Sequence, residues 1–468
     1  MFLKKYVGDK AFYKMVLTIA VPMMVQNGIS NFVNLLDNLM IGRIGTNALS
    51  GVAITNQIIF VFYLLMFGAT AGVGIFTAQY HGMGDVEGVR YTFRVKLIIN
   101  TLLSAGGIAL LYFNSDFLIG LFLKGEGSAW DALQTLEIGH DYMRIMLIGL
   151  VPIAITNSYS GTLRDTGQTR IPMLASLSAI FVNLIGNFIL IYGYFGMPAL
   201  GAVGAATATV ISRFVELTFL LLYTARHSSE HPFIIGAYTK FYVPWELFWR
   251  FFVKSIPLIV NETLWSLGQT TLNQSFSFRS LIAMAAINIE STVWMLFSVA
   301  FAAMGEAAGI ITGQILGNGE IDRAIDDSRK LRAFTVACGI VFGLLMLLIS
   351  PFFPKFYNTT DEVRSMASRL ILISGLLMPL IAYTHVTYFI LRSGGNTFIT
   401  FLFDSCFVWT VAVPVAFILS RYTRLPVVTM VAIVKSLELI KCLTGGKMIQ
   451  SGIWAKKIVD DTGAHSRQ

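Results

Sequence analysis

Charged side chains are scarce in this 468-residue sequence, where Asp, Glu, Lys and Arg together account for 13% of the residues. Soluble domains carry about 25% charged residues, so this composition excludes a soluble protein. Hydrophobic residues make up 55%, and the apolar runs are about 20–30 residues long, which suits membrane-spanning helices and exceeds the ~10 residues of a barrel strand. The sequence therefore predicts an all-α integral membrane protein.

Cysteine is also rare, and Cys338, Cys406 and Cys442 all lie within apolar segments. An odd number of cysteines in such segments argues against a disulfide framework. The only close pair of histidines, His227 and His231, lies in a polar stretch with Glu230. No metal-ligand set of the usual spacing is completed there, so we interpret the stretch as a solvated linker.

Nucleotide-binding loops are absent from the sequence. The glycine-rich turns at 82–84 and 317–319 fit neither GxGxxG nor GxxxxGK[ST], and neither follows a predicted strand. This excludes ATP as the direct energy source, and nothing indicates an enzyme. The net charge of +8 is explained by basic loops rather than by a nucleic-acid partner.

Twelve apolar segments are long enough to span a bilayer. They lie at about 15–40, 51–79, 95–113, 140–162, 171–194, 201–224, 251–275, 282–306, 333–353, 367–391, 398–420 and 426–445. Lys and Arg concentrate in the N-terminus, alternate loops and the C-terminus, which predicts that both termini are cytoplasmic. An even number of spans is then required. The first apolar run is longer than the 7–15 residues of a signal-peptide core, so no cleavable signal is predicted.

The two halves of the sequence repeat one another. The recurring segments are 78–85 with 313–320, 163–169 with 391–397, and 211–217 with 433–439, and Pro22 corresponds to Pro257. Because each half has an even number of spans, the repeats are parallel. We therefore predict an N-terminal six-helix bundle at 1–225, a cytoplasmic linker at 226–250, a C-terminal bundle at 251–450 and a cytoplasmic tail at 451–468.

The first predicted span contains two features that a plain membrane anchor does not need. Pro22 removes a helix hydrogen bond and predicts a kink. Asp37 places a carboxylate among apolar residues, at a cost of at least ~2.5–3.5 kcal/mol near a helix centre. Asn183 and Asn187 lie four residues apart on one face of the fifth span. These oxygen-bearing side chains predict a site for Na⁺ or for a proton held on Asp37, although packing by interhelical amide bonds is the alternative.

The second half contains its own acids within predicted spans. The candidates, in order, are Glu262, Glu290, Asp404 and Glu306, and Pro257 predicts a kink before the first of them. A cation and a proton can compete for such a carboxylate, which is the chemistry of ion coupling. We interpret Arg213 with Glu216, and Lys435 with Glu438, as structural ion pairs, because each pair is three residues apart on one helical face.

The sequence resembles the multidrug and toxic compound extrusion (MATE) family of bacterial transporters over residues 12 to 450. The resemblance rests on Asp37–Gly45, on the paired Gln-x-x-Gly-x-Gly turns, and on Leu163–Gly167 with its copy. It implies two six-helix bundles in a V that opens alternately to either side, and a first-half cation site at Asp37, Asn183 and Asn187 with a seventh-helix acid at Glu262. The tenth span has no carboxylate, unlike that of sodium-linked relatives, so coupling through Asp37 is favoured.

These observations lead to one principal hypothesis and two alternatives. The principal hypothesis is a monomeric secondary antiporter in the bacterial inner membrane, which is surrounded by lipid and exports small organic compounds in exchange for H⁺ or Na⁺. A lipid-linked oligosaccharide flippase of the same superfamily is the first alternative, and it requires a basic cavity for the diphosphate. A membrane receptor or scaffold without transport is the second.

Overall fold

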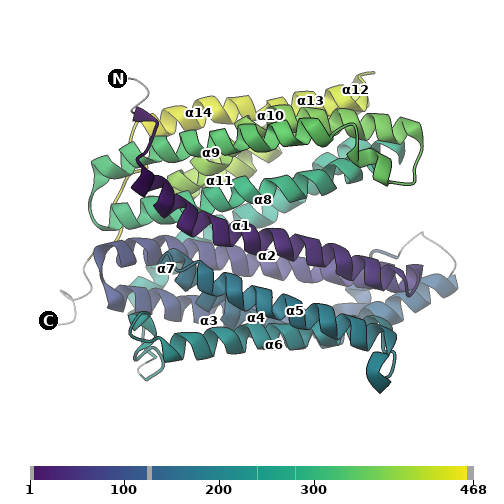
Figure 1. Cartoon of the computed structure of the whole chain (residues 1–468), viewed down its shortest axis with the longest axis horizontal. Helices are drawn as coiled ribbons and strands as arrows, with labels where there is room; N and C mark the ends of the chain where they lie inside the picture. Colours follow the sequence, from purple (N-terminus) through teal and green to yellow (C-terminus); the bar gives the residue numbers. More distant parts are fainter. Residues whose placement is uncertain (1–4, 124–128, 240, 280, 461–468) are drawn as a thin grey trace. The chain divides into compact units, whose positions relative to one another are not determined.

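The computed structural model describes residues 5–123, 129–239, 241–279 and 281–460. In these ranges the chain is helical and contains no strand (Figure 1). The first half contains α1 (Lys10–Gly42), α2 (Thr46–Met83), α3 (Val86–Gly120), α4 (Ala129–Asp165), α5 (Arg170–Tyr192) and α6 (Gly201–Arg226). The second half begins with α7 (Trp245–Ser277), α8 (Leu281–Gly317), α9 (Ile321–Ile349) and α10 (Asp361–Ser393).

The last two spans are built from shorter pieces. The eleventh consists of α11 (Thr397–Phe401), two π-helical turns at Leu402–Cys406 and Val408–Ala412, and α12 (Val413–Tyr422). The twelfth consists of α13 (Val427–Ser436) and α14 (Glu438–Gln450). Short 3₁₀ helices occur at Tyr194–Gly196, Pro232–Ile234 and Phe353–Phe356. Each of the twelve predicted spans therefore has a helical counterpart among the described residues.

Ten helices in the described ranges are long and apolar enough to cross a membrane. The remaining two predicted spans are α7, which is 33 residues long and begins with a charged turn containing Glu246, and the divided pair α13 and α14. The helices extend past the predicted spans, because polar turns at their ends also form backbone hydrogen bonds. Thus α7 begins at Trp245, inside the predicted linker of residues 226–250.

Local sequence signals account for several helix ends. The Thr360 hydroxyl accepts a hydrogen bond from the Val363 amide at 3.4 Å, and Asp361 and Glu362 occupy the first turn of α10. Both features favour a helix N-terminus, because they pair with its free amides and its positive dipole end. Gly193 ends α5 in the left-handed conformation with φ 76°, which glycine adopts without the steric cost of a Cβ atom.

The chain forms two compact units, and their boundaries differ from the predicted domains. Unit 1 contains the described residues up to Met24, Ala78–Asp85 and the described residues from Ile256 onward, whereas unit 2 contains Val25–Thr77 and Val86–Ser255. The first half of α1 thus belongs to unit 1 and the first third of α7 to unit 2. Each division lies within two residues of Pro22 or Pro257, where the helix lacks one backbone hydrogen bond.

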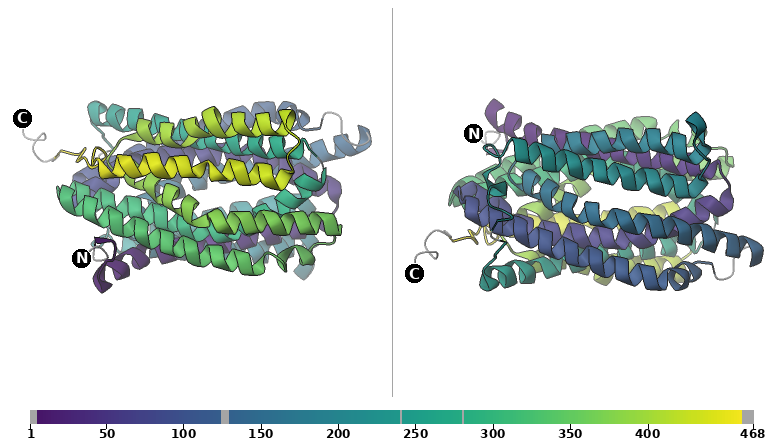
Figure 2. Two further views of the ribbon diagram at one scale, coloured as in Figure 1. Left: turned by 90° about the horizontal axis from the view of Figure 1, so that it is seen from above. Right: turned by 90° about the horizontal axis from the view of Figure 1, so that it is seen from below.

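Each unit has its own hydrophobic core. In unit 2, α5 packs against α6, and α4 packs against α3 and α6 (Figures 1 and 2). In unit 1, α10 is the central helix and contacts α8, α9, α13 and α14. Val16, Ala20 and Met23 of α1 are buried in the same unit 1 cluster as Ala307 and Ala308 of α8.

The duplicated Gln-x-x-Gly turns contact one another within unit 1. A Cβ atom on Gly82 would lie 1.9 Å from the carbonyl oxygen of Gln314, and a Cβ atom on Gly317 would lie 1.9 Å from that of Gln79. Gln314 is the copy of Gln79, and Gly317 is the copy of Gly82, so the contact is reciprocal. Both glycines are therefore required for the close approach of α2 to α8.

Part of the predicted linker is docked on the protein, which corrects the interpretation of a fully solvated stretch. His231 and Phe233 are only 2% and 3% exposed. Arg94 of α3 donates hydrogen bonds of 2.8–2.9 Å to the carbonyl oxygens of Gly236, Ala237 and Tyr242. A loop buries its backbone in this way only when its carbonyl groups find donors, and the arginine supplies them.

The described part of the predicted tail is also packed, whereas residues 461–468 lie outside the described residues. Trp454 is 1% exposed. Gln79 accepts a hydrogen bond from the Ile458 amide at 2.8 Å and donates one to the Lys456 carbonyl at 3.1 Å. The segment after α14 is thereby fixed to the end of α2 within unit 1.

Candidate functional site

Unit 2 brings together the three side chains predicted to form the first-half cation site. Asn187 Nδ2 donates a hydrogen bond to Asp37 Oδ1 at 2.6 Å, and the same nitrogen lies 3.3 Å from Asn183 Oδ1. Asp37 comes from α1, whereas both asparagines come from one face of α5. Asn187 is 1% exposed, Asn183 is 6% exposed and Asp37 is partly buried.

One oxygen of this cluster has no hydrogen-bond partner among the described residues. Asn187 Oδ1 is buried without a donor, and such a group normally costs about 1–3 kcal/mol. Asn183 Nδ2 is satisfied by Thr209 Oγ1 of α6 at 3.1 Å. The cluster therefore offers a carboxylate and an unpaired amide oxygen, which are ligands suited to a small hard cation or to a protonated carboxyl group.

A basic side chain near this cluster is neutralised by another acid. Arg213 Nη1 of α6 lies 3.0 Å from Glu216 Oε2, which confirms the predicted ion pair. Arg213 interacts with Asp37 only at longer range, and no ion pair to Asp37 occurs in the described part of the chain. The Asp37 carboxylate thus remains available for a mobile cation.

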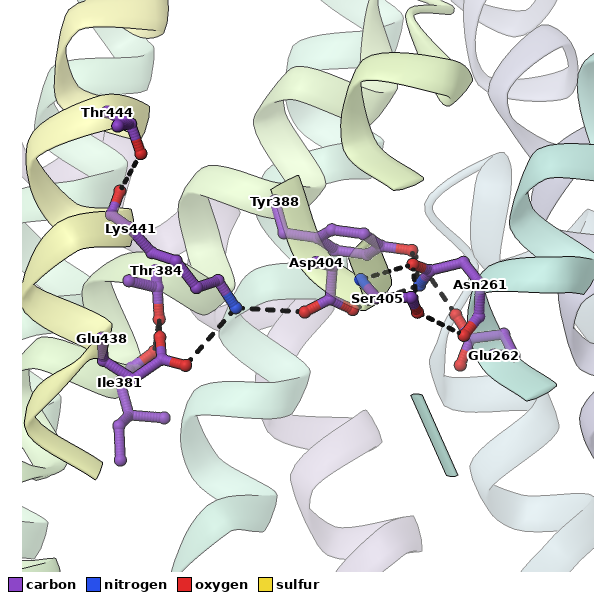
Figure 3. Close-up of polar contacts among 10 residues, drawn as sticks. All are labelled: Asn261, Glu262, Ile381, Thr384, Tyr388, Asp404, Ser405, Glu438, Lys441 and Thr444. Carbon is purple, nitrogen blue, oxygen red and sulfur yellow. Dashed lines mark hydrogen bonds and ion pairs between the residues drawn. The ribbon is translucent and has the colours of Figure 1, made fainter. Parts of the chain in front are cut away.

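The second-half acids Glu262 and Asp404 join one hydrogen-bond network in unit 1 (Figure 3). Asn261 Nδ2 of α7 donates to Asp404 Oδ2 at 3.1 Å and lies 3.2 Å from the Tyr388 hydroxyl of α10. The Tyr388 hydroxyl in turn donates to Glu262 Oε1 at 3.4 Å. Asn261, which is 1% exposed, is therefore the residue that links the two acids.

A π-helical turn positions Asp404 and Ser405 for this network. In Leu402–Cys406 the regular α-helical pairing is interrupted, which releases backbone groups for other partners and is frequent at functional sites. The Ser405 amide donates to Asn261 Oδ1 at 3.2 Å, and the Ser405 hydroxyl donates to the same oxygen at 2.7 Å. The Asn261 side chain of α7 thus holds the eleventh span in its widened π-helical form.

Glu290 lies in a different polar cluster from the other second-half candidates. Its Oε1 accepts hydrogen bonds from Ser374 Oγ at 2.5 Å and Lys435 Nζ at 2.7 Å. The predicted pairing of Lys435 with Glu438 is therefore wrong. The α13 helix ends at Ser436, and Glu438 at the start of α14 pairs instead with Lys441, at 3.4 Å.

Two buried lysines have partners that the sequence did not predict: Lys441, which lies within a predicted span, and Lys96. Lys96 Nζ, 1% exposed, lies 2.7 Å from Asp165 Oδ2 in unit 2, and Lys441 Nζ lies 3.1 Å from Asp404 Oδ1 in unit 1. Asp165 belongs to the duplicated Leu163–Thr169 segment, and this repetition was the available signal. The partner lysines lie far away in sequence, so the spacing of residues within one helix does not reveal the pairs.

The residue types around Asp37 also bear on which ion fits there. In the described ranges, no group of three or more His, Cys, Asp or Glu side chains is placed to hold a metal ion. The Asp37 cluster has a single carboxylate with two amides, so its charge suits a monovalent cation rather than a divalent one. Asp37, Asn183 and Asn187 are the side chains that would hold it.

The sequences of known proteins identify the family of this chain. The pattern of the MatE family matches residues 22–189 and 257–418, one match in each half. The chain belongs to the MatE family. The prediction of a MATE relationship is thereby confirmed, and this MatE protein is a multi-pass membrane transporter rather than an enzyme.

Individual relatives support the same assignment. The chain is 25% identical to the probable multidrug resistance protein NorM of Thermotoga maritima, with 95% of this chain and 94% of that protein covered. It is also 25% identical to the probable multidrug resistance protein YoeA of Bacillus subtilis, with 87% of each chain covered.

Solved structures confirm the predicted helical fold. An outward-facing multidrug resistance MATE transporter of the MOP superfamily matches with a TM-score of 0.82, 18% identity, and coverage of 96% of this chain and 98% of that chain. A MOP superfamily transporter from Pyrococcus furiosus matches with a TM-score of 0.80 at 18% identity and the same coverage.

Proposed function

We propose that this MatE protein is a secondary antiporter that exports small amphipathic or cationic organic compounds in exchange for H⁺ or Na⁺. The observation that carries the proposal is the Asp37 cluster, where a partly buried carboxylate accepts a hydrogen bond from Asn187 and the Asn187 oxygen is buried without a partner among the described residues. The names of the relatives as multidrug resistance proteins support the class of cargo.

The coupling role follows from the position of Asp37 on a shared helix. The α1 helix is divided between the two units after Met24, close to Pro22, and Asp37 lies on its unit 2 part. A bound cation changes the charge on this part of α1 and thereby favours one of its conformations, which is the requirement for linking ion binding to alternating access. Pro22 supplies the point at which the helix can bend.

Four basic residues within the helices do not favour the flippase alternative. Lys96, Arg213, Lys435 and Lys441 each pair with a carboxylate at 2.7–3.1 Å. A diphosphate needs unpaired basic side chains to bind it, and these four are already neutralised. The surrounding polar amides and carboxylates suit a cationic cargo better than an anionic one.

Efflux of a cationic dye from proteoliposomes tests the proposal. Separate H⁺ and Na⁺ gradients are imposed on vesicles containing the wild type or the Asp37→Asn variant, which keeps the side-chain volume but removes the ionisable carboxyl group. One of the gradients is expected to drive efflux by the wild type, and neither by the variant. Gradient-driven efflux that is unchanged in Asp37→Asn would contradict the coupling role, and absence of flux in the wild type would favour the receptor or scaffold alternative.

The location and assembly of the protein complete the proposal. Basic residues in the N-terminus, alternate loops and the C-terminus support a bacterial inner-membrane protein with both termini in the cytoplasm. The protein acts as a monomer in contact with membrane lipids, since one chain supplies all three side chains of the Asp37 cluster.

A further inference from the structure

The Lys441 side chain in unit 1 is surrounded as a bound cation would be. It is 8% exposed, and its ammonium nitrogen lies 3.1 Å from Asp404 Oδ1 and 3.4 Å from Glu438 Oε1 (Figure 3). The ring centroids of Phe403 and Phe407 lie 5.3 Å and 5.9 Å from the same nitrogen. Carboxylate oxygens and aromatic faces are the groups that hold a monovalent or organic cation out of water.

The two carboxylates are held in place by other helices. Asp404 Oδ2 accepts a hydrogen bond from Asn261 Nδ2 of α7 at 3.1 Å, and Glu438 Oε2 accepts one from Thr384 Oγ1 of α10 at 2.8 Å. The oxygens that face the ammonium group are therefore the ones left free by these contacts. This arrangement fixes the position between the acids independently of the lysine.

Lys435, another lysine paired with an acid in this half, lacks such a position. Lys435 Nζ contacts one carboxylate, Glu290, and the Ser374 hydroxyl at 2.6 Å. Its side chain is 26% exposed, compared with 8% for Lys441. Lys435 therefore serves as a matched control, because it is also a lysine paired with an acid in unit 1 but does not lie between two acids.

We propose that Lys441 is a tethered cation that fills the second-half cation position between Asp404 and Glu438. While the lysine is present, the position between Asp404 and Glu438 takes no ion from solution. The inference rests on the proposed function and deepens it, because it names Lys441 as the residue that prevents the second-half position from exchanging ions. It also accounts for why Asp404 and Glu438 are retained without forming an open cation site.

Chemical rescue tests the proposal. The Lys441→Ala variant removes the tether and leaves space between the acids, and propylammonium chloride supplies an untethered amine of about the same size. The unfolding temperature of purified Lys441→Ala is expected to rise by several degrees with saturable dependence on propylammonium. The wild type, Lys441→Arg and Lys435→Ala are expected to show no saturable rise.

A double variant tests whether rescue by the amine depends on Asp404, and Na⁺ binding to the wild type provides a second measurement. In Lys441→Ala/Asp404→Asn the rescue is expected to disappear, because one of the two acids is lost. An unchanged unfolding temperature of Lys441→Ala in propylammonium, or an equal rise in Lys435→Ala, would overturn the proposal. If Lys441→Ala does not fold, binding of radioactive Na⁺ to the wild type and to Asp404→Asn decides, since Na⁺ binding that depends on Asp404 contradicts a permanently filled position.

The outcome is separable from that of the proposed function. Amine rescue depends only on residues of unit 1, so it is expected also in an Asp37→Asn background. If Asp37→Asn keeps its coupled efflux, the coupling role of Asp37 fails while the tethered cation stands. If rescue fails while Asp37→Asn abolishes coupling, the tethered cation alone is rejected.

Discussion

Asp37 in unit 2 and Asp404 in unit 1 each accept a hydrogen bond from an asparagine on another helix, Asn187 at 2.6 Å and Asn261 at 3.1 Å. The electrostatic settings of the two acids differ. Asp404 Oδ1 lies 3.1 Å from Lys441 Nζ, whereas Arg213, the basic residue that interacts with Asp37 at longer range, pairs with Glu216. A carboxylate that is paired with a lysine has no net charge to attract a cation from solution, whereas a carboxylate without a charged partner can exchange cations.

The comparison also shows how a duplicated chain can keep its framework while its sites diverge. The Gln-x-x-Gly turns remain reciprocal, because Gly82 and Gly317 occupy equivalent contacts. The backbone approach of two helices tolerates few residue types, so both copies are constrained in the same way. The polar sites do not follow the repeat in this way, because Asp37 lies on the first span of its half and Asp404 on the fifth span of the other.

The largest expected effect is on coupled transport, and it separates the two acids. We expect Asp37→Asn to reduce gradient-driven efflux on the order of 10–100-fold, as for the loss of a typical coupling free energy, and Asp404→Asn to change it by less than about threefold. The measurement is the initial rate of dye efflux from proteoliposomes. An equal loss in Asp404→Asn would show that both halves exchange ions.

The second expected effect concerns the buried lysine of the other unit. Lys96→Met removes the fully buried ammonium group that lies 2.7 Å from Asp165 Oδ2, and breaking such a pair should destabilise the protein by up to about 3–5 kcal/mol. Lys96→Met/Asp165→Asn removes both charges and should recover a large part of this loss. Denaturant unfolding in detergent measures both values, and a neutral Lys96→Met would contradict a structural role.

The third effect tests the equivalence of the duplicated turns. Gly82→Ala and Gly317→Ala should each reduce the free energy of unfolding by about 1–3 kcal/mol, as overpacking does, and by similar amounts. Gly106→Ala in α3 is the control, since a Cβ atom there meets nothing within 4 Å and should be neutral or slightly stabilising. Clearly unequal losses for the two turns would show that the reciprocal contact is not energetically equivalent.

The smallest effect concerns the docked linker of unit 2, which contains His231. The docked tail of unit 1 has no histidine among its described residues 451–460, so it serves as the comparison. Burial lowers the pKa of His231 from its usual 6.5, and its Nε2 atom has no partner among the described residues. The unfolded histidine therefore binds a proton at higher pH than the folded one, so the docked form loses stability as the pH falls below 6.5. Limited proteolysis of the linker should accelerate below that pH in the wild type but not in His231→Gln.

Composition and repetition sufficed to predict the membrane class, the twelve helical segments and the duplication. Long apolar runs and few charges leave helices as the only way to satisfy the backbone in lipid, and Asn183 and Asn187 share a face because of helical periodicity. Asp37 was already marked by its position in an apolar span, and the resemblance to known transporters assigned the same three residues to a cation site. These predictions depend on local pattern or on family motifs, both of which are present in the sequence itself.

Only the tertiary structure decided which charges meet. Lys96 with Asp165, Lys435 with Glu290 and Lys441 with Asp404 are pairs between different helices, and helical spacing predicted the wrong partner for Lys435. The docking of the linker by Arg94 was likewise hidden, since its partners are backbone carbonyl groups that every sequence contains. Sequence spacing specifies neighbours along one helix, whereas the partner of a buried charge depends on how separate helices rotate and pack.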